Sequence, residues 1–477
     1  MGDREALLDA AAASAEVGLT YLGITANEDR LQDHVPETIS VFRAAGIRVW
    51  VLTGDKVETA VEIAKSCALF DSHMDLTYLV DMDGPDQCIQ TLQAAANVQN
   101  PARARGLVLD GRAAGFILEN GTARTLLHEV GVATSSCVCC RLSPMQKRAL
   151  VELVRKEDPK AITLAVGDGA NDVPMIQGAH IGVGIRGREG SAAVQASDVA
   201  ISQFSFLGNL VLCHGRKAYR RVALFLNMFM HKSIMIGWSY AVYAVTSGFS
   251  GQPAYPVALD MVWSFLTSCV LFMTAFDSDY PDDVALRTPE LFAAGPSRAL
   301  FNAKVFSLWV LSATLQGTIA WVVPIYGLTS PADRLVPPPD GGAFWQASFV
   351  AYTVNILIVH GKMLFQVTPQ WNRWGAFAIF EFTGELVAYV LWVAVAEVFF
   401  KKYPVFTGVA HAATSSGWHW LFLLVGLALA LSLDAAELLF RRLLGCARAR
   451  GGGDAARGGK LDRARGAQQA GHRASHE

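Results

Sequence analysis

The sequence contains few charged residues for its length. Asp, Glu, Lys and Arg make up 17% of the 477 residues, whereas soluble globular chains contain about 25%. Apolar residues reach 52%, so the composition indicates that part of the chain lies in lipid. The net charge of −2 argues neither for nor against a nucleic-acid partner, and we expect none.

Two kinds of short motif are also missing. The first residues, from Met1 to Glu5, include no basic segment followed by an apolar run, so they do not form a secretory signal peptide. The eight cysteines include one cluster, Cys137, Cys139 and Cys140, but no second cluster of Cys or His completes four zinc ligands. The ligand count therefore favours a buried strand in a reducing cytosol.

Long apolar runs begin abruptly near residue 222. Six of them approach the roughly 20 residues that a helix needs to cross a bilayer, so they predict a bundle of six transmembrane helices. Beyond them, residues 446–477 are rich in Gly, Ala and Arg, a composition typical of a disordered basic tail. The six predicted spans lie at about 222–246, 256–276, 303–327, 344–365, 374–400 and 418–440.

The basic residues predict the orientation of these spans. Most of them flank the ends that would share one side of the membrane, and few lie on the other. By the positive-inside rule, the amino-terminal region and both chain ends face the cytosol. The residues on the cytosolic side are Arg216, Lys217, Arg220, Arg221, Arg287, Arg298, Lys304, Arg373, Arg441 and Arg442, against Arg334, Lys401 and Lys402 on the opposite side.

The amino-terminal 215 residues alternate short apolar runs with helical patterns. This alternation predicts a parallel sheet covered on both faces, an α/β fold. Ser143, Pro144 and Gln146 predict a helix start, since Ser can cap it, Pro suits the first turn and Gln can complete a capping box. The candidate strands are residues 48–52, 107–109, 137–140, 161–166, 180–185 and 198–201.

Three polar sets follow candidate strands, where parallel sheets bind ligands. The first is Thr53-Gly54-Asp55-Lys56, and the second is Arg141 with Lys147. The third is the segment 167–172, which contains Asp168 and Asp172. Two carboxylates beside a phosphate suit Mg²⁺, and together with a hydroxyl and a lysine they can stabilise a transferring phosphoryl group.

Each set alone has an ordinary interpretation: a tight turn, a solvated lysine, or loop aspartates that cap a helix. The order of hydroxyl, lysine and acidic loop, however, resembles the second, third and fourth motifs of the haloacid dehalogenase-like phosphotransferases. The segments 53–56 and 167–175 resemble the hinge motifs of the P-type ATPases. Further stretches resemble their type IV, phospholipid-flippase branch: residues 28–33, 35–39 and 139–144, His214-Gly215-Arg216 and Phe301-Asn302.

The resemblance implies an incomplete α/β haloacid dehalogenase-like (Rossmann-like) phosphorylation domain over residues 1–215, a transmembrane domain over 216–445 and the tail over 446–477. It implies a phospholipid translocase driven by ATP and Mg²⁺, moving lipid toward the cytosolic leaflet. An accessory subunit would be a partner. The protein would lie in the plasma membrane, the Golgi or the endosome, with the organelle left open. The resemblance places Thr53, Gly54 and Asp55 around the ATP phosphates, Arg141 and Lys147 at nucleotide or phosphate, Asp168 and Asp172 at Mg²⁺, and Asn171 at the phosphate.

Three of the ionisable residues within the predicted spans can be interpreted from their depth. Lys232 lies about ten residues into the first span, where flippases carry a lysine. A charged side chain near the middle of a membrane is costly, so its presence there indicates a functional role. The alternative for Lys232 is snorkelling to the nearer interface. Glu381 and Glu385 lie near the cytosolic start of the fifth span, where we expect exposure at the interface.

The phosphorylated aspartate of the P-type ATPases, in an Asp-Lys-Thr-Gly-Thr motif, is absent from these 477 residues. The nearest imitation, Asp81-Met82-Asp83-Gly84, is better explained as a surface turn. The first four spans, the actuator domain and the nucleotide-binding domain of the family are also absent. Without the nucleophile there is no aspartyl-phosphate cycle, so we expect this polypeptide alone to be inactive.

Local departures from the flippase pattern leave the cargo open. Ser233 follows Lys232 where flippases have Asn, and Thr267-Ser268-Cys269 continues without the usual proline break. A cation-transporting ATPase is one alternative, but ion pumps place carboxylates at mid-membrane, and Asp260 lies near an outer end. A non-catalytic membrane protein that binds an accessory subunit or a complementary pump fragment is the other.

Overall fold

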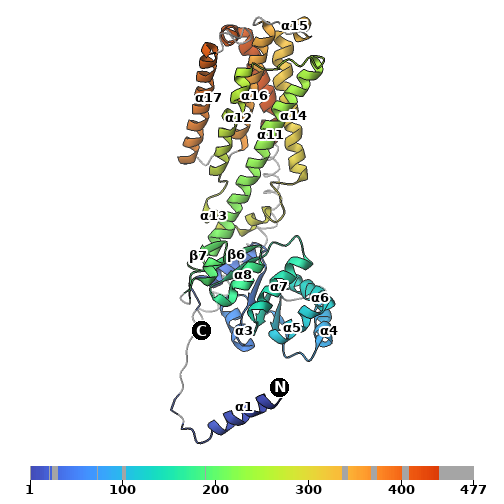
Figure 1. Cartoon of the computed structure of the whole chain (residues 1–477), viewed down its shortest axis with the longest axis vertical. Helices are drawn as coiled ribbons and strands as arrows, with labels where there is room; N and C mark the ends of the chain where they lie inside the picture. The colour runs from blue at the N-terminus through green and yellow to red at the C-terminus, as the bar shows by residue number, and fades with distance from the viewer. Residues whose placement is uncertain are drawn as a thin grey trace, which may run out of the picture. The chain divides into compact units, whose positions relative to one another are not determined.

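A computed structural model describes residues 2–20, 22–23, 31–71, 73–98, 104–187, 190–335, 342–366, 373–399 and 408–439. The polypeptide divides into two compact units (Figure 1). The first comprises Met1–Ser40 and Arg48–Phe206, and the second comprises Val41–Ile47 and Leu207–Glu477. The predicted tail at 446–477 lies outside the described residues, as do Arg441, Arg442, Lys401 and Lys402.

The first unit contains two parallel sheets. The larger has the strand order β1-β4-β3-β2 and the smaller β5-β6-β7, with every pairing parallel. β3 and β4 are completely buried, as is expected for central strands of a sheet covered on both faces. The strands are β1 (Val49–Leu52), β2 (Asp75–Leu79), β3 (Arg105–Asp110), β4 (Ser136–Cys140), β5 (Leu164–Gly167), β6 (Ile181–Ile185) and β7 (Val199–Ile201).

The predicted α/β class is therefore confirmed, while the haloacid dehalogenase-like assignment stays a prediction. Among the candidate strands, the apolar run 161–166 differs most: it contributes to a sheet only from Leu164, because β6 pairs with residues 164–167. Ile162, within the excluded part of the run, is 71% exposed. The helices of this unit are α1 (Gly2–Ala15), α2 (Val35–Ala44), α3 (Val57–Ser66), α4 (Pro85–Ala96), α5 (Gly111–Glu119), α6 (Gly121–Ala133), α7 (Pro144–Glu157), η1 (Ala170–Asp172), α8 (Val173–Gly178) and α9 (Ala192–Gln195), where α2 extends into the second unit.

The predicted capping box at the start of α7 is confirmed. The Ser143 hydroxyl accepts from the Gln146 N–H at 3.3 Å, and the Gln146 side chain accepts from the Ser143 N–H at 3.0 Å. The Gln146 amide also donates to the Gly111 carbonyl at 2.7 Å. These contacts fix the first turn of α7, which carries Lys147.

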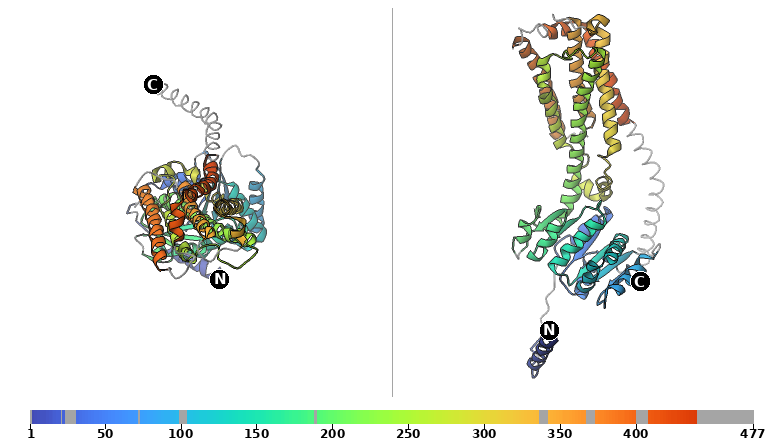
Figure 2. Two further views of the ribbon diagram at one scale, coloured as in Figure 1. Left: turned by 90° about the horizontal axis from the view of Figure 1, so that it is seen from above. Right: turned by 45° about the vertical axis from the view of Figure 1, so that its right-hand side comes forward.

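The second unit is helical, and its long helices lie side by side (Figures 1 and 2). Its short elements are α10 (Phe206–Gly208, starting at the boundary), the π-helix η2 (Asn209–Gly215), η3 (Met273–Phe276), α13 (Asp282–Arg287), η4 (Pro289–Ala294), α15 (Pro331–Leu335) and α18 (Val409–Ser415). The long helices are α11 (Arg216–Thr246), α12 (Val257–Phe272), α14 (Ala303–Leu328), α16 (Ala343–Gln366), α17 (Arg373–Phe399) and a last helix over Gly417–Leu439.

Four helices within the described ranges are long and apolar enough to cross a membrane: Val257–Phe276, Ala303–Leu328, Ala343–Gln366 and Gly417–Leu439. Four of the six predicted spans thus correspond to helices that are long and apolar enough to cross a membrane, and the other two stay predictions. α11 is 31 residues long but is not among the four, because its interior carries Asn227, His231 and Lys232, which are buried against other helices. α17 is a helix of 27 residues whose spanning stays a prediction.

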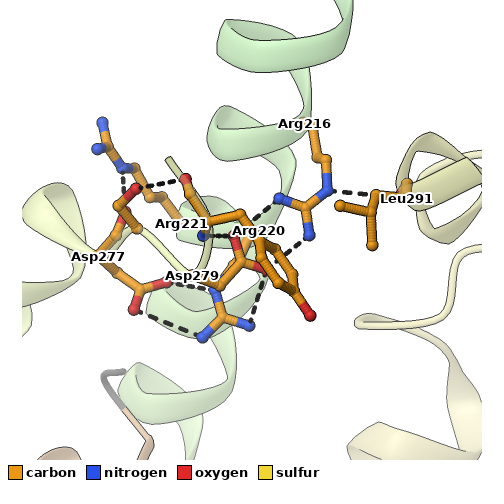
Figure 3. A network of polar contacts seen from close by, with 8 residues as sticks. Arg216, Arg220, Arg221, Asp277, Asp279 and Leu291 are labelled. Carbon is orange, nitrogen blue, oxygen red and sulfur yellow. Dashed lines mark hydrogen bonds and ion pairs between the residues drawn. The ribbon is translucent and has the colours of Figure 1, made fainter. Parts of the chain in front are cut away.

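A cluster of ion pairs fastens the start of α11 to the segment after α12 (Figure 3). The Arg216 guanidinium donates to both carboxylate oxygens of Asp279, at 2.7 and 2.6 Å, and to the Leu291 carbonyl at 3.3 Å. Arg220 pairs with Asp277, and Arg221 donates to the Asp277 carbonyl at 2.9 Å. Charge-assisted, bidentate contacts of this kind hold a planar arginine in one geometry.

Asp279→Asn is expected to lower the free energy of unfolding by about 2 kcal/mol at pH 7, the size of a hydrogen bond to a charged group. Burial disfavours ionised Asp279, but the bond from Arg216 and the charges of Arg220 and Arg216 outweigh it and lower the pKa of Asp279. Its ionisation therefore stabilises the fold above an unfolded pKa of about 3.9, and this stabilisation is lost as pH falls. Thermal melts should show the wild-type advantage shrinking below that pH, and a constant difference would contradict this assignment.

Candidate functional site

The Thr53-Gly54-Asp55 loop at the end of β1 is joined to the loop after β4. The Thr53 N–H donates to the Cys139 carbonyl at 2.8 Å, which continues the β1–β4 ladder. The Arg141 N–H donates to the Asp55 carbonyl at 2.9 Å, and the Leu142 N–H to the Thr53 carbonyl at 3.0 Å. Two of the three predicted polar sets are therefore adjacent through their backbones.

The side chains of this loop remain close to solvent. The Thr53 hydroxyl donates to the Asp55 carboxylate at 2.6 Å and accepts from the Asp55 N–H at 3.2 Å. Arg141 has a φ of 51°, a left-handed conformation that costs a non-glycine residue free energy and is frequent at functional sites. The loop thus presents a hydroxyl, a carboxylate and a guanidinium at one edge of the sheet.

Lys147 and Asp172 form a largely buried ion pair. Lys147 Nζ donates to Asp172 Oδ1 at 2.8 Å, and the two side chains are only 10% and 15% exposed. Lys147 lies on the first turn of α7, and Asp172 ends η1 just before α8, which packs against α7. A Cβ at Gly167 would lie 2.3 Å from the Asp172 Cβ, so only glycine admits the aspartate at this strand end.

Asp168 and Asn171 are exposed beside this pair. No three His, Cys, Asp or Glu side chains gather into a metal site anywhere in the part of the chain that the structure describes. Two carboxylates are nevertheless a fitting donor set for Mg²⁺, which is usually held by one or two carboxylates with substrate phosphates and water completing the shell. Across the described ranges, no hydrogen bond or ion pair joins the Lys147–Asp172 pair to the Thr53 loop.

The clustered cysteines occupy β4, as the sequence predicts. Cys137, Cys139 and Cys140 are all fully buried. Burial, with smaller effects from neighbouring charges, raises the pKa of Cys140 to about 12. The thiol is therefore protonated at neutral pH, as suits an inert core side chain rather than a reactive one.

Lys232 is buried within the helical unit. It is 4% exposed, and its Nζ donates to the Thr267 and Ser268 hydroxyls of α12, at 3.2 Å each. The Phe229 ring lies 5.6 Å from the same nitrogen. Snorkelling to an interface is excluded by this burial, and α12 runs unbroken through both hydroxyl residues, as its sequence without proline predicts.

Sequence reasoning missed a second buried basic group, Lys362 on α16. Lys362 pairs with Asp434 on the last helix and donates to the Ser312 hydroxyl of α14 at 2.9 Å. The Gln316 amide donates to the other Asp434 oxygen at 2.7 Å, and its carbonyl lies 2.7 Å from His231 Nε2 on α11. The network joins four helices, and a charged residue inside an apolar run was its only sequence signal.

The expectation that Glu385 is exposed at the interface is wrong. Glu385 on α17 is 8% exposed, and its carboxyl oxygen lies 2.6 Å from His360 Nε2 on α16. The helical period of α17 turns this carboxyl inward, toward a partner that the sequence of one helix does not identify. The Glu381 side chain lies outside the described residues.

Comparisons with known proteins identify the family. The family described as "Phospholipid-translocating P-type ATPase C-terminal" matches residues 194–445, more than half of the chain. The "Probable phospholipid-transporting ATPase DNF3" of Saccharomyces cerevisiae is 36% identical over 381 residues, which cover 79% of this chain and 22% of that protein.

Two further relatives extend the comparison. "Phospholipid-transporting ATPase DRS2" of Saccharomyces cerevisiae is 32% identical over 459 residues, 93% of this chain and 33% of that protein. "Phospholipid-transporting ATPase ID" of Homo sapiens is 34% identical over 402 residues, 76% of this chain and 33% of that protein. The chain thus spans a third or less of the length of these relatives. It belongs to the phospholipid-translocating P-type ATPase family, the flippases, and corresponds to their carboxyl-terminal region.

Proposed function

We propose that this chain is the carboxyl-terminal part of an ATP-driven translocase that moves phospholipid toward the cytosolic leaflet. The observation that carries the proposal is the environment of Lys232. Its ammonium has hydroxyl partners and an aromatic ring, but no carboxylate partner among the described residues. A buried cation without a counter-charge favours an anionic ligand, such as the phosphate of a lipid headgroup.

The other buried charges of the bundle argue against a cation as cargo. A cation site needs free carboxylates, but Asp434 is neutralised by Lys362 and Glu385 is bonded to His360. Lys232 therefore stands out as the basic group left for a substrate. The proposal places the lipid phosphate between α11 and α12, near the Thr267 and Ser268 hydroxyls.

In the first unit we propose that Asp168 and Asp172 hold Mg²⁺ and that Thr53, Gly54, Asp55, Arg141, Lys147 and Asn171 surround the ATP phosphates. Bound Mg²⁺ would neutralise charge on the transferring phosphoryl group. Lys147 would supply a further positive charge, and its bond to Asp172 holds both groups at one place. The Thr53 hydroxyl would donate to a phosphate oxygen.

The nucleophile must come from a polypeptide segment outside these 477 residues. β1 lies at the edge of its sheet, and its four residues, all apolar, are only half-buried. β5 lies at the edge of the other sheet. An apolar edge that no other described strand covers favours pairing with a further strand, so a complementary pump segment carrying the phosphorylated aspartate is the partner we propose.

Photolabelling of the purified chain tests the lipid site. A phospholipid with a photoreactive group near its phosphate should label α11 or α12, and Lys232→Ala should reduce labelling by about tenfold, as expected for about 1.4 kcal/mol of lost binding. Ser233→Ala is the matched control, because Ser233 is exposed on the same helix and its hydroxyl donates to the Phe229 carbonyl of its own helix. Equal labelling of Lys232→Ala, or competition by a metal cation, would contradict the proposal.

A further inference from the structure

His360 and Glu385 form a buried pair between α16 and α17. The two side chains are 4% and 8% exposed, and His360 Nε2 lies 2.6 Å from Glu385 Oε2. On its other side, His360 Nδ1 lies 2.8 Å from the Ile356 carbonyl oxygen, one turn earlier in α16. Both ring nitrogens therefore face oxygen atoms.

The hydrogen-bond partners fix the number of protons. A carbonyl oxygen only accepts, so Nδ1 must carry a proton. A neutral imidazole then has a bare Nε2, and an ionised carboxylate would set lone pair against lone pair at 2.6 Å. One further proton must lie between Nε2 and Oε2, and the pair that shares it is neutral overall.

The second carboxyl oxygen indicates which atom holds this proton. Glu385 Oε1 is buried and has no hydrogen-bond partner among the described residues. An ionised carboxylate with a bare buried oxygen is costly, whereas a carboxylic acid leaves its carbonyl oxygen unpaired at a smaller cost. We propose that His360 and Glu385 form a proton-binding site inside the bundle, in which Glu385 is a carboxylic acid that donates to His360 Nε2.

Other described titratable groups on these helices have partners of their own, so none of them supplies the proton between Nε2 and Oε2. Tyr389, one turn further along α17, is bonded to the Thr353 hydroxyl of α16 at 2.8 Å. Lys362 on α16 pairs with Asp434 of the last helix, and Asp260 of α12 pairs with Tyr240 of α11.

The site makes the contact between α16 and α17 depend on a proton. Loss of the proton leaves a net negative charge inside the bundle and two facing lone pairs, which favours separation of the two helices. Gaining it restores a neutral, hydrogen-bonded contact.

Infrared difference spectroscopy of the purified full chain at pH 7 tests the proposal. The spectrum of wild type minus Glu385→Gln is expected to contain the carbonyl stretching band of a carboxylic acid, and this band should move to lower frequency in deuterium oxide. Glu385→Gln should keep the wild-type melting temperature, because the Gln amide can donate to Nε2 as the acid does. Absence of the band, or only carboxylate bands in the difference, would overturn the proposal.

Two further variants secure the assignment. Glu290→Gln removes an exposed carboxyl of η4 and should give no acid band in its difference spectrum; the same band there would refute the assignment to Glu385. His360→Phe leaves the acid without its acceptor, so the band should move to higher frequency. This second measurement also decides the matter if Glu385→Gln does not fold, since an unmoved band in folded His360→Phe would count against the pair.

Discussion

Asp434→Asn is expected to lower the free energy of unfolding of the helical unit by about 3–5 kcal/mol, the usual cost of breaking a buried ion pair from one side. Lys362 and Asp434 are 1% and 2% exposed, so the substitution leaves the lysine buried without a carboxylate partner. Lys362→Met should lower the free energy of unfolding by a similar amount, because it leaves the Asp434 carboxylate buried without its lysine partner. Unfolding in detergent, followed by circular dichroism, measures both.

The double variant Lys362→Met/Asp434→Asn distinguishes a charge effect from lost packing. Removing both charges should recover most of the stability lost in either single variant, because replacing a whole buried pair by neutral groups is often nearly neutral. Lys304→Met is the matched control, since Lys304 is an exposed lysine at the start of α14 and should change little. Additive losses in the double variant would show that the pair does not act as a unit.

The second large effect concerns phosphoryl transfer. The chain alone should form no acid-stable phosphoenzyme with labelled ATP, because it contains no Asp-Lys-Thr-Gly-Thr nucleophile. When it is joined to the amino-terminal part of a relative such as DRS2, phosphorylation should appear. Asp172→Asn in that joined protein should slow it by about 10²–10³-fold, the cost of removing one preorganised charge from such a site.

A matched variant separates this role from folding. Glu152→Gln changes a half-exposed carboxylate on α7 that pairs with Arg148, and it should leave phosphorylation unchanged. Lys147→Ala should resemble Asp172→Asn, because each loses the 2.8 Å bond to the other. A wild-type rate of phosphorylation in Asp172→Asn would show that this aspartate does not take part in the site.

Much of the first unit could be predicted because its signals are local. β4 is a continuous apolar run, and the capping residues Ser143 and Gln146 lie three positions apart. β2 could not be predicted, because its residues mix polar and apolar types and Tyr78 is 47% exposed at the sheet edge. α5 and α6 were missed because both begin with glycine, although the Asp110 and Asn120 side chains cap them.

For the candidate site, the sequence indicated which residues lie on each loop, and their assignment to a site stays a prediction. The bond between Lys147 and Asp172 was not, because it joins residues 25 positions apart on different helices. The same limit applies to Lys232 with Thr267, and to Glu385 with His360. Helical spacing places a charge on one face of one helix, and only packing identifies the residue opposite.

Translocation of a fluorescent phospholipid across vesicles tests the central claim most directly. The chain is joined to the amino-terminal part of DRS2 and reconstituted with ATP and Mg²⁺. We predict ATP-dependent movement of the lipid between leaflets, abolished by Asp172→Asn and strongly reduced by Lys232→Ala, but unchanged by Ser233→Ala. Full activity of Lys232→Ala, or ATP-dependent flux of a cation without lipid movement, would contradict the account.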